Sequence, residues 1–169
     1  MLSRLITTLF IITILAFSAI APGTASAAVT AGMTDGAKLS MLSLFAGHNI
    51  KVALYTAASA SFTQASTVYS ATGEQTATSS GYASGGYNYS ANTCTASLTG
   101  STPKTAQLTC PAASWTQSGS NPITADTAVL YDATDGNKIL GIYSFTSATA
   151  SGGGTFTLTL PANTLYLGP

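Results

Sequence analysis

The sequence predicts a mainly β protein, a single β-sandwich-like domain with one short amphipathic helix near its N-terminus. Two observations carry this expectation. From residue 50 onward, apolar and polar residues alternate over several short stretches, which is the period of strands with one buried face. Gly, Pro, Asn and Asp separate these stretches, as turns between short strands require.

The helix is expected between residues 34 and 47. Thr34 or Asp35 can cap its first turn, and Gly47 stands where a chain commonly leaves a helix. Its apolar residues recur every three positions, at Leu39, Leu42 and Phe45, with Met41 beside them. Its polar residues are expected to face solvent: Lys38, Ser40 and Ser43.

The strands are expected on both sides of a loop-rich region. Residues 50–55 form a good half-buried strand, whereas residues 57–92 indicate long loops around weak strands. Further on, residues 127–132 and 138–145 flank Asp135-Gly136, a hairpin signal. Two more strands are expected at 155–160, ended by Pro161, and at 165–167.

The N-terminus has the pattern of a secretory signal. Arg4 precedes an apolar run, Leu5 to Ile20, and small residues follow at Ala25-Ser26-Ala27. We expect residues 1–27 to be a signal peptide cleaved between Ala27 and Ala28, leaving one β-rich structural domain over residues 28–169. The alternative is a retained membrane anchor, although the run is shorter than the roughly 20 residues that a spanning helix needs.

The charge balance limits the partners. Beyond residue 27 there is no arginine, and four lysines stand against five acidic residues. Nucleic-acid binding depends on clustered Lys and Arg that neutralise phosphates, so no nucleic-acid partner is expected. Ser, Thr, Asn and Gln provide the polar surface instead, which is more typical of a structural or surface protein than of a cytosolic enzyme.

The two cysteines are predicted to pair. If residues 93–98 and 105–110 form a hairpin with its turn centred on Thr102, the apolar residues fix one register. In that register the facing pairs are Leu98 with Ala106, Ala96 with Leu108, and Cys94 with Cys110. An exported chain meets an oxidising compartment, so a disulfide is expected. Free thiols or a metal-binding pair are the alternatives.

The residues that usually carry catalysis are sparse. His48 is the only histidine, and no G-x-S-x-G nucleophile motif accompanies it. Asp132 and Asp135 are close enough for acid–base chemistry or for a calcium loop, but their residue types equally suit a tight turn. The sequence therefore predicts no enzyme, no cofactor and no metal.

A cluster of tyrosines offers a possible contact site. Tyr82, Tyr87 and Tyr89 lie close together with Asn88 and several glycines. Such a loop can stack on a glycan or meet a partner protein. The alternative is that the same rings cover a loop-rich core, and Trp115 is expected to be a core residue.

One resemblance extends over roughly residues 34–162. Its segments are IKVALYT at 50–56, YSATGE at 69–74, Gly81-Tyr82 with Gly85-Gly86, Trp115, LYD at 130–132 and GNK at 136–138. Their order resembles small virion structural proteins of tailed bacteriophages, the tail or decoration type. The resemblance implies a sandwich-like accessory subunit that works by assembly with copies of itself or other subunits, and has no active site.

The resemblance also gives a role to a few residues. It implies that Glu74, Gly81-Tyr82 and Gly85-Gly86 shape a loop at a subunit contact. A signal peptide and a disulfide are foreign to proteins assembled in a host cytoplasm, so both departures indicate an exported relative. The alternative function is an exported cell-surface or filament subunit, or an adhesin that uses the tyrosine-rich loop. A membrane contact is expected only through the N-terminal segment, if it is retained.

Overall fold

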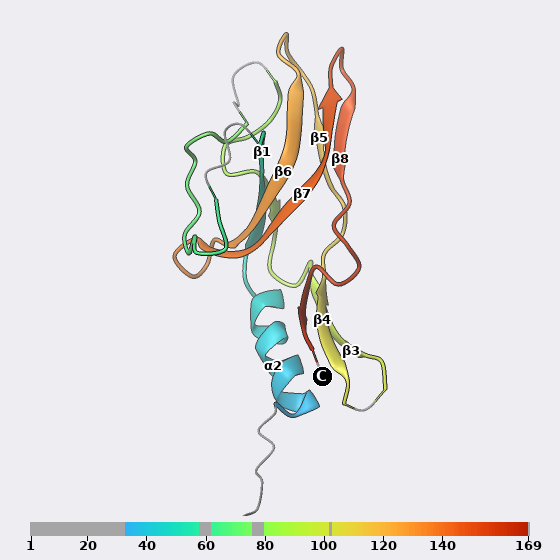
Figure 1. The fold of residues 1–169 in the computed structure, drawn as a ribbon. Helices are drawn as coiled ribbons and strands as arrows, with labels where there is room; N and C mark the ends of the chain where they lie inside the picture. The colour runs from blue at the N-terminus through green and yellow to red at the C-terminus, as the bar shows by residue number, and fades with distance from the viewer. Residues whose placement is uncertain (1–32, 58–61, 76–79, 102, 169) are drawn as a thin grey trace, which may run out of the picture. The chain divides into compact units, whose positions relative to one another are not determined.

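A computed structural model describes residues 33–57, 62–75, 80–101 and 103–168 (Figure 1). The predicted signal and its cleavage point between Ala27 and Ala28 lie outside these residues. From Met33 onward the chain forms one compact unit. It is mainly β: of the described residues, 43% are in strands and 9% in a helix, so the predicted sandwich-like fold with a single helix near the N-terminus is confirmed.

The helix α2 (Asp35–Ala46) begins and ends close to its predicted bounds. The Thr34 hydroxyl accepts a hydrogen bond from the amide of Ala37, which satisfies one free donor of the first turn. Gly47 follows the last turn with φ of −77°, so the helix ends here without a left-handed residue.

The predicted exposure of Lys38 is wrong. Its side chain is only 3% exposed, and the Nζ atom donates to the carbonyl oxygen of Lys104 at 2.9 Å. The Asp35 carboxylate lies 3.6 Å from the same Nζ atom and also accepts from the amide of Lys104. Lys38 is therefore a paired, buried cation that joins the helix to the chain just before β4, and a buried cation needs such partners.

The main sheet is antiparallel with the order β2-β1-β6-β7. Its strands are β2 (Tyr87–Tyr89), β1 (Ile50–Tyr55), β6 (Ile123–Asp132) and β7 (Lys138–Ala150). The predicted hairpin around Asp135-Gly136 is the β6–β7 connection. The predicted half-burial of residues 50–55 is wrong, because Ala53 and Tyr55 are fully buried as well as Val52 and Leu54.

Both faces of this sheet are covered. On one face the short strands β5 (Ala113–Thr116) and β8 (Thr155–Leu158) pair with each other and supply Trp115, Phe156 and Leu158 to the main core. On the other face the long connection after β1 lays Phe62 and Tyr69 against Tyr55 and Tyr131. A strand buried on both faces needs no polar alternation.

The third sheet has the order β3-β4-β9, with β3 (Thr95–Thr99), β4 (Thr105–Thr109) and β9 (Leu165–Leu167). Ala96 faces Leu108 and Leu98 faces Ala106, which is the register predicted from the sequence. Apolar side chains on this face join the core cluster that contains Leu42 of α2 and against which Phe45 packs. Figure 1 shows α2 alongside these strands. The helix therefore covers one face of this sheet.

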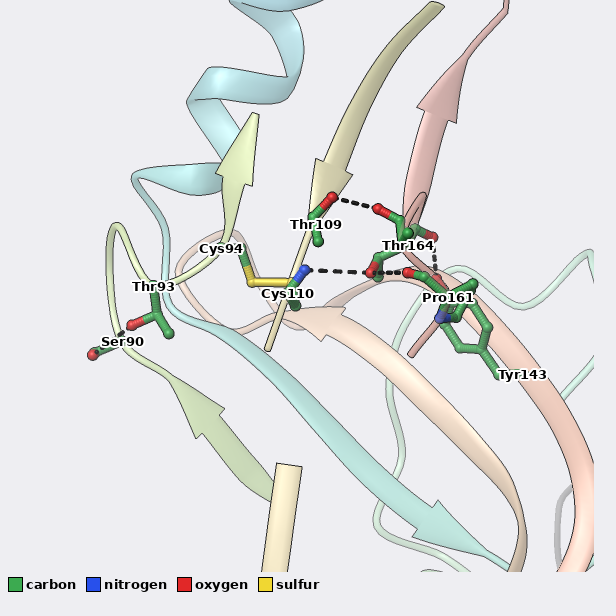
Figure 2. The surroundings of a disulfide bond; sticks show 9 residues. Ser90, Thr93, Cys94, Thr109, Cys110, Tyr143, Pro161 and Thr164 are labelled. Carbon is green, nitrogen blue, oxygen red and sulfur yellow. Dashed lines mark hydrogen bonds between the residues drawn. A yellow bond between two sulfur atoms is a disulfide. The ribbon is translucent and has the colours of Figure 1, made fainter. Parts of the chain in front are cut away.

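The predicted disulfide is present. Cys94 and Cys110 are bonded at the end of the β3–β4 hairpin, and both are almost completely buried (Figure 2). The amide of Cys110 donates to the hydroxyl of Thr164, which in turn donates to the carbonyl of Pro161. The bridge thus lies where the hairpin meets the segment leading into β9.

Candidate functional site

The carboxylate of Glu74 is the centre of a hydrogen-bonded cluster in the loop that covers the main sheet. The Tyr69 hydroxyl donates to Oε2 at 2.5 Å, and the Tyr82 hydroxyl donates to Oε1 at 2.6 Å. The amide of Gly85 donates to Oε1 at 2.8 Å, and the Ser84 hydroxyl lies 3.4 Å from Oε2. A half-buried carboxylate with this many donors is well satisfied and fixed in place.

The cluster is tied to the main sheet. The Tyr82 hydroxyl accepts from the amide of Leu54 at 2.9 Å, and the amide of Gln75 donates to the carbonyl of Leu54 at 2.7 Å. The Tyr131 hydroxyl donates to the carbonyl of Gly85 at 2.8 Å. These bonds hold a segment without regular strands against β1 and β6.

The tyrosine hydroxyls of this cluster have raised pKa values and are protonated at neutral pH. Burial raises the pKa of Tyr82 far above its ordinary value, and the hydrogen bond to Glu74 raises it further. Burial also raises the pKa of Tyr69, with the same carboxylate as the second cause, and raises the pKa of Tyr131 to about 12. The phenols stay protonated: those of Tyr69 and Tyr82 donate to Glu74 and that of Tyr131 donates to the carbonyl of Gly85, so these bonds hold the loop together.

Glycines allow the loop to approach the sheet. Gly81, Gly85 and Gly86 all have positive φ, between 75° and 87°. A Cβ atom on Gly86 would lie 2.0 Å from the carbonyl oxygen of Val52, and one on Gly81 would lie 2.3 Å from that of Thr116. Only glycine fits these two positions. The residues that the phage-like resemblance singles out therefore share a loop and shape it through these contacts.

The four residues predicted as a contact site differ in how far their side chains are exposed. Tyr82 and Tyr89 are 2% and 1% exposed, so their rings belong to the core and offer no surface to a partner in this fold. Tyr87 is half-buried against Trp115, and Asn88 is exposed. Tyr82 and Tyr89 thus have the packing role that the sequence left as the alternative, and Trp115 is buried as expected.

One close pair was not predicted. His48 Nδ1 lies 2.6 Å from the Asp132 carboxylate, although 84 positions separate the two residues. Asp132 is fully buried and also accepts from the amides of Thr134 and Asp135, which makes it the first residue of the β6–β7 turn. The antiparallel register that pairs Ile50 with Asp132 brings His48 to this end of the sheet.

The two aspartates considered for acid–base chemistry do not form a carboxylate pair. Asp132 is occupied by the turn and by His48, whereas Asp135 is exposed and forms an ion pair with Lys138 at 2.8 Å. Within the described part of the chain, no group of three or more His, Cys, Asp or Glu side chains could hold a metal ion. Asp132 and Asp135 therefore belong to a tight turn.

Two surface features remain outside the core. Met41 and Leu44 of α2 are exposed, Leu44 at 67%, and so is Met33 just before the helix; we call these three residues the apolar stripe. A cavity of about 320 Å³ lies between Thr63, Gln64 and Ser66 on one side and residues 139–142 of β7 on the other. The side chains that line the cavity are hydroxyl, amide and aliphatic groups, and none of them is ionisable.

The described residues include no helix that is long and apolar enough to cross a membrane. Comparisons with models of known protein families, with curated proteins and with solved structures found no significant match.

Proposed function

We propose that this chain is a non-enzymatic structural subunit of a virion or virion-like assembly, such as a tail, fibre or capsid-decoration accessory. It acts through contacts with copies of itself or with other structural subunits. The observation that carries the proposal is the apolar stripe, in which Met41 and Leu44 of α2 and Met33 just before the helix leave large apolar side chains in solvent.

The stripe has the chemistry of a protein contact. Its residues are uncharged, and the two charged residues of α2, Asp35 and Lys38, are turned toward each other and toward Lys104 instead. Methionine side chains are flexible and adapt to a partner surface. Contiguous exposed apolar residues on an otherwise polar surface mark interaction sites.

The rest of the molecule supports a scaffolding role. The ionisable side chains of the Glu74 cluster are used to fix a loop, and the Asp132 carboxylate is used to fix a turn. The resemblance to phage tail proteins agrees with this use, because it implies a subunit without an active site. The described residues thus use their buried polar groups to maintain shape.

The disulfide supports an exported form of the subunit. Disulfides persist in oxidising compartments and are rare in the cytosol, and Cys94 and Cys110 are bonded here. An exported filament or cell-surface subunit is therefore the second candidate. Mass spectrometry of protein purified from the producing cells distinguishes cleavage from retention: a mature chain starting at Ala28 supports export, whereas a chain starting at Met1 argues for an anchor or an internal subunit.

The assembly itself is tested by charge insertion into the stripe. We expect the purified wild-type protein to form dimers or larger particles in sedimentation velocity and electron microscopy. Leu44→Lys and Met41→Lys should return it to a monomer, because a lysine at a buried contact is costly. Val68→Lys is the matched control, since Val68 is 53% exposed on a different surface. A wild-type protein that is monomeric at all concentrations would contradict the proposal.

A further inference from the structure

The face of the β3-β4-β9 sheet that points away from α2 is lined almost entirely by hydroxyl groups. The register places the side chains of alternate residues on one face. Ala106 and Leu108 point to the core and are fully buried. The residues of opposite parity lie on the other face, and we call them the hydroxyl face: Thr95, Ser97, Thr99, Thr105, Gln107, Thr109 and Tyr166. Those of β4 are half-buried, and the Thr109 hydroxyl donates to the carbonyl of Ala162.

Tyr166 gives this face an exposed aromatic ring. It is 63% exposed and lies beside Gln107, which in turn lies beside Ser97, so a tyrosine, an amide and a hydroxyl form one row across the three strands. Tyr82 and Tyr89, by contrast, are buried. The surface on which a ring could stack is therefore on this sheet and not on the loop that the sequence indicated.

The hydroxyl face carries no charge and no aliphatic side chain. The nearest charged residue in the sequence, Lys104, precedes β4, and its amide donates to Asp35 of α2 on the opposite side of the sheet. Ser and Thr hydroxyls both donate and accept hydrogen bonds, and the Gln107 amide does the same. An uncharged face of this kind complements a neutral ligand that itself presents hydroxyls and has an apolar side for the tyrosine ring.

We propose that the hydroxyl face binds a neutral polysaccharide, with Tyr166 stacking on a sugar ring and Gln107 and Ser97 bonding its hydroxyls. The site does not depend on the proposed assembly, because the apolar stripe lies on the solvent side of α2 whereas the hydroxyl face lies on the far side of the sheet that α2 covers. The two surfaces can be tested separately.

The shape of the face selects a polymer over a small sugar. The sheet has two five-residue strands and one three-residue strand, so its face measures about 10 Å across the strands and about 16 Å along the two longer ones. A single sugar would bury little of its surface there, whereas small ligands generally need a concave pocket. A polysaccharide chain lying across the strands contacts the whole row from Tyr166 to Ser97.

A protein partner fits this face less well. Protein interfaces have cores enriched in aromatic residues, Met and Arg, and here Tyr166 is the single residue of those kinds. The apolar stripe has that composition instead. This contrast assigns the stripe to protein contacts and the hydroxyl face to a polar, uncharged polymer.

The test is affinity electrophoresis of the full chain in native gels that contain one soluble polysaccharide each. The neutral probes are a mixed-linkage β-glucan, a mannan, a dextran and a xylan; alginate is the acidic probe. We expect at least one neutral probe to retard the wild-type protein. Tyr166→Ala should weaken that retardation about tenfold, which corresponds to the loss of one stacking contact and its neighbours. Gln107→Ala should weaken it less.

Two further variants serve as controls for Tyr166→Ala. Tyr166→Phe keeps the ring and should retain binding within about threefold, since the hydroxyl is not the stacking group. Leu44→Lys changes the apolar stripe and should leave retardation unchanged, even if it abolishes assembly. Circular dichroism spectra like that of the wild type show that each variant is folded.

Three outcomes would overturn the proposal. They are no retardation by any neutral probe, retardation by alginate alone, or equal retardation of the wild type and a folded Tyr166→Ala. Loss of self-association in Tyr166→Ala, without any effect of a polysaccharide, would instead assign the face to a second copy of the chain.

Discussion

The hydroxyl of Tyr82 lies between Glu74 and Leu54, donating to the carboxylate of the first at 2.6 Å and accepting from the amide of the second at 2.9 Å. One buried phenol thus connects an irregular loop to the edge of β1. The loop covers a face of the main sheet that would otherwise expose Tyr55 and Tyr131. Loss of this connection should therefore destabilise more than the loop.

Glu74→Gln should lower the free energy of unfolding by about 1–3 kcal/mol, because the half-buried acceptor loses its charge and one of its two oxygens. Urea unfolding followed by tyrosine fluorescence measures the change. Asp135→Asn is the matched control: it removes an exposed ion pair with Lys138, which contributes little to stability because solvent screens it. Equal effects of the two substitutions would contradict the role given to Glu74.

Gly86→Ala should destabilise the protein by at least about 2–3 kcal/mol, since it adds backbone strain to a collision with β1. The new Cβ atom would lie 2.0 Å from the Val52 carbonyl oxygen. Gly100→Ala has a similar positive φ but open space around it, so it isolates the strain and should cost about 1 kcal/mol. Thermal unfolding of both variants compares them directly, and similar losses would argue against the close approach.

Removal of the disulfide should cost about 3 kcal/mol, the loop-closure value for a bridge across 16 residues. The double variant Cys94→Ala/Cys110→Ala should unfold at lower urea, and a reductant should lower the stability of the wild type but not of the variant. Labelling of the unfolded, unreduced wild-type protein with a thiol reagent would show that the bridge is absent.

Alkaline pH should unfold the protein. Burial raises the pKa of Tyr82, Tyr69, Tyr55 and Tyr89 in the folded state and raises those of Tyr131 and Tyr143 to about 12. The unfolded chain then releases protons near pH 10 while the folded chain retains them, so this stability is complete below about pH 10 and is lost above it. Tyrosinate absorbance and circular dichroism should change together between pH 10 and 12; ionisation of all tyrosines near pH 10 without unfolding would contradict this.

The hairpin of β3 and β4 could be predicted in detail because residues within its two strands determine the register. The alternation of Ala96, Leu98, Ala106 and Leu108 fixes which residues face inward, and one register satisfies all four. A single-residue slip would turn every one of them to solvent. Extended by one more pair, the same register brings Cys94 opposite Cys110, which is why the disulfide follows from the sequence.

Other positions could not be predicted because distant segments decide them. The position of Lys38 on the helix predicts an exposed side chain. Its partner, the carbonyl of Lys104, lies 66 positions later in the sequence, just before β4. Ala53 and Tyr55 look like the outer face of a strand, but a loop without strand periodicity covers them. Glu74 and Tyr82 meet only after that loop has closed, and the order of their motif was the sole sequence sign of the contact.

The disulfide between Cys94 and Cys110 has a mechanical consequence. Residues 95–109 form a side branch of the covalent chain, because a force applied between the two ends passes through the sulfur atoms and bypasses the hairpin. Stretching the protein would therefore release roughly 50 Å less contour length than its residue number suggests. While the bridge is intact, the covalent backbone of the β3–β4 hairpin would carry no tensile load, and reduction of the bridge would place that backbone under tension.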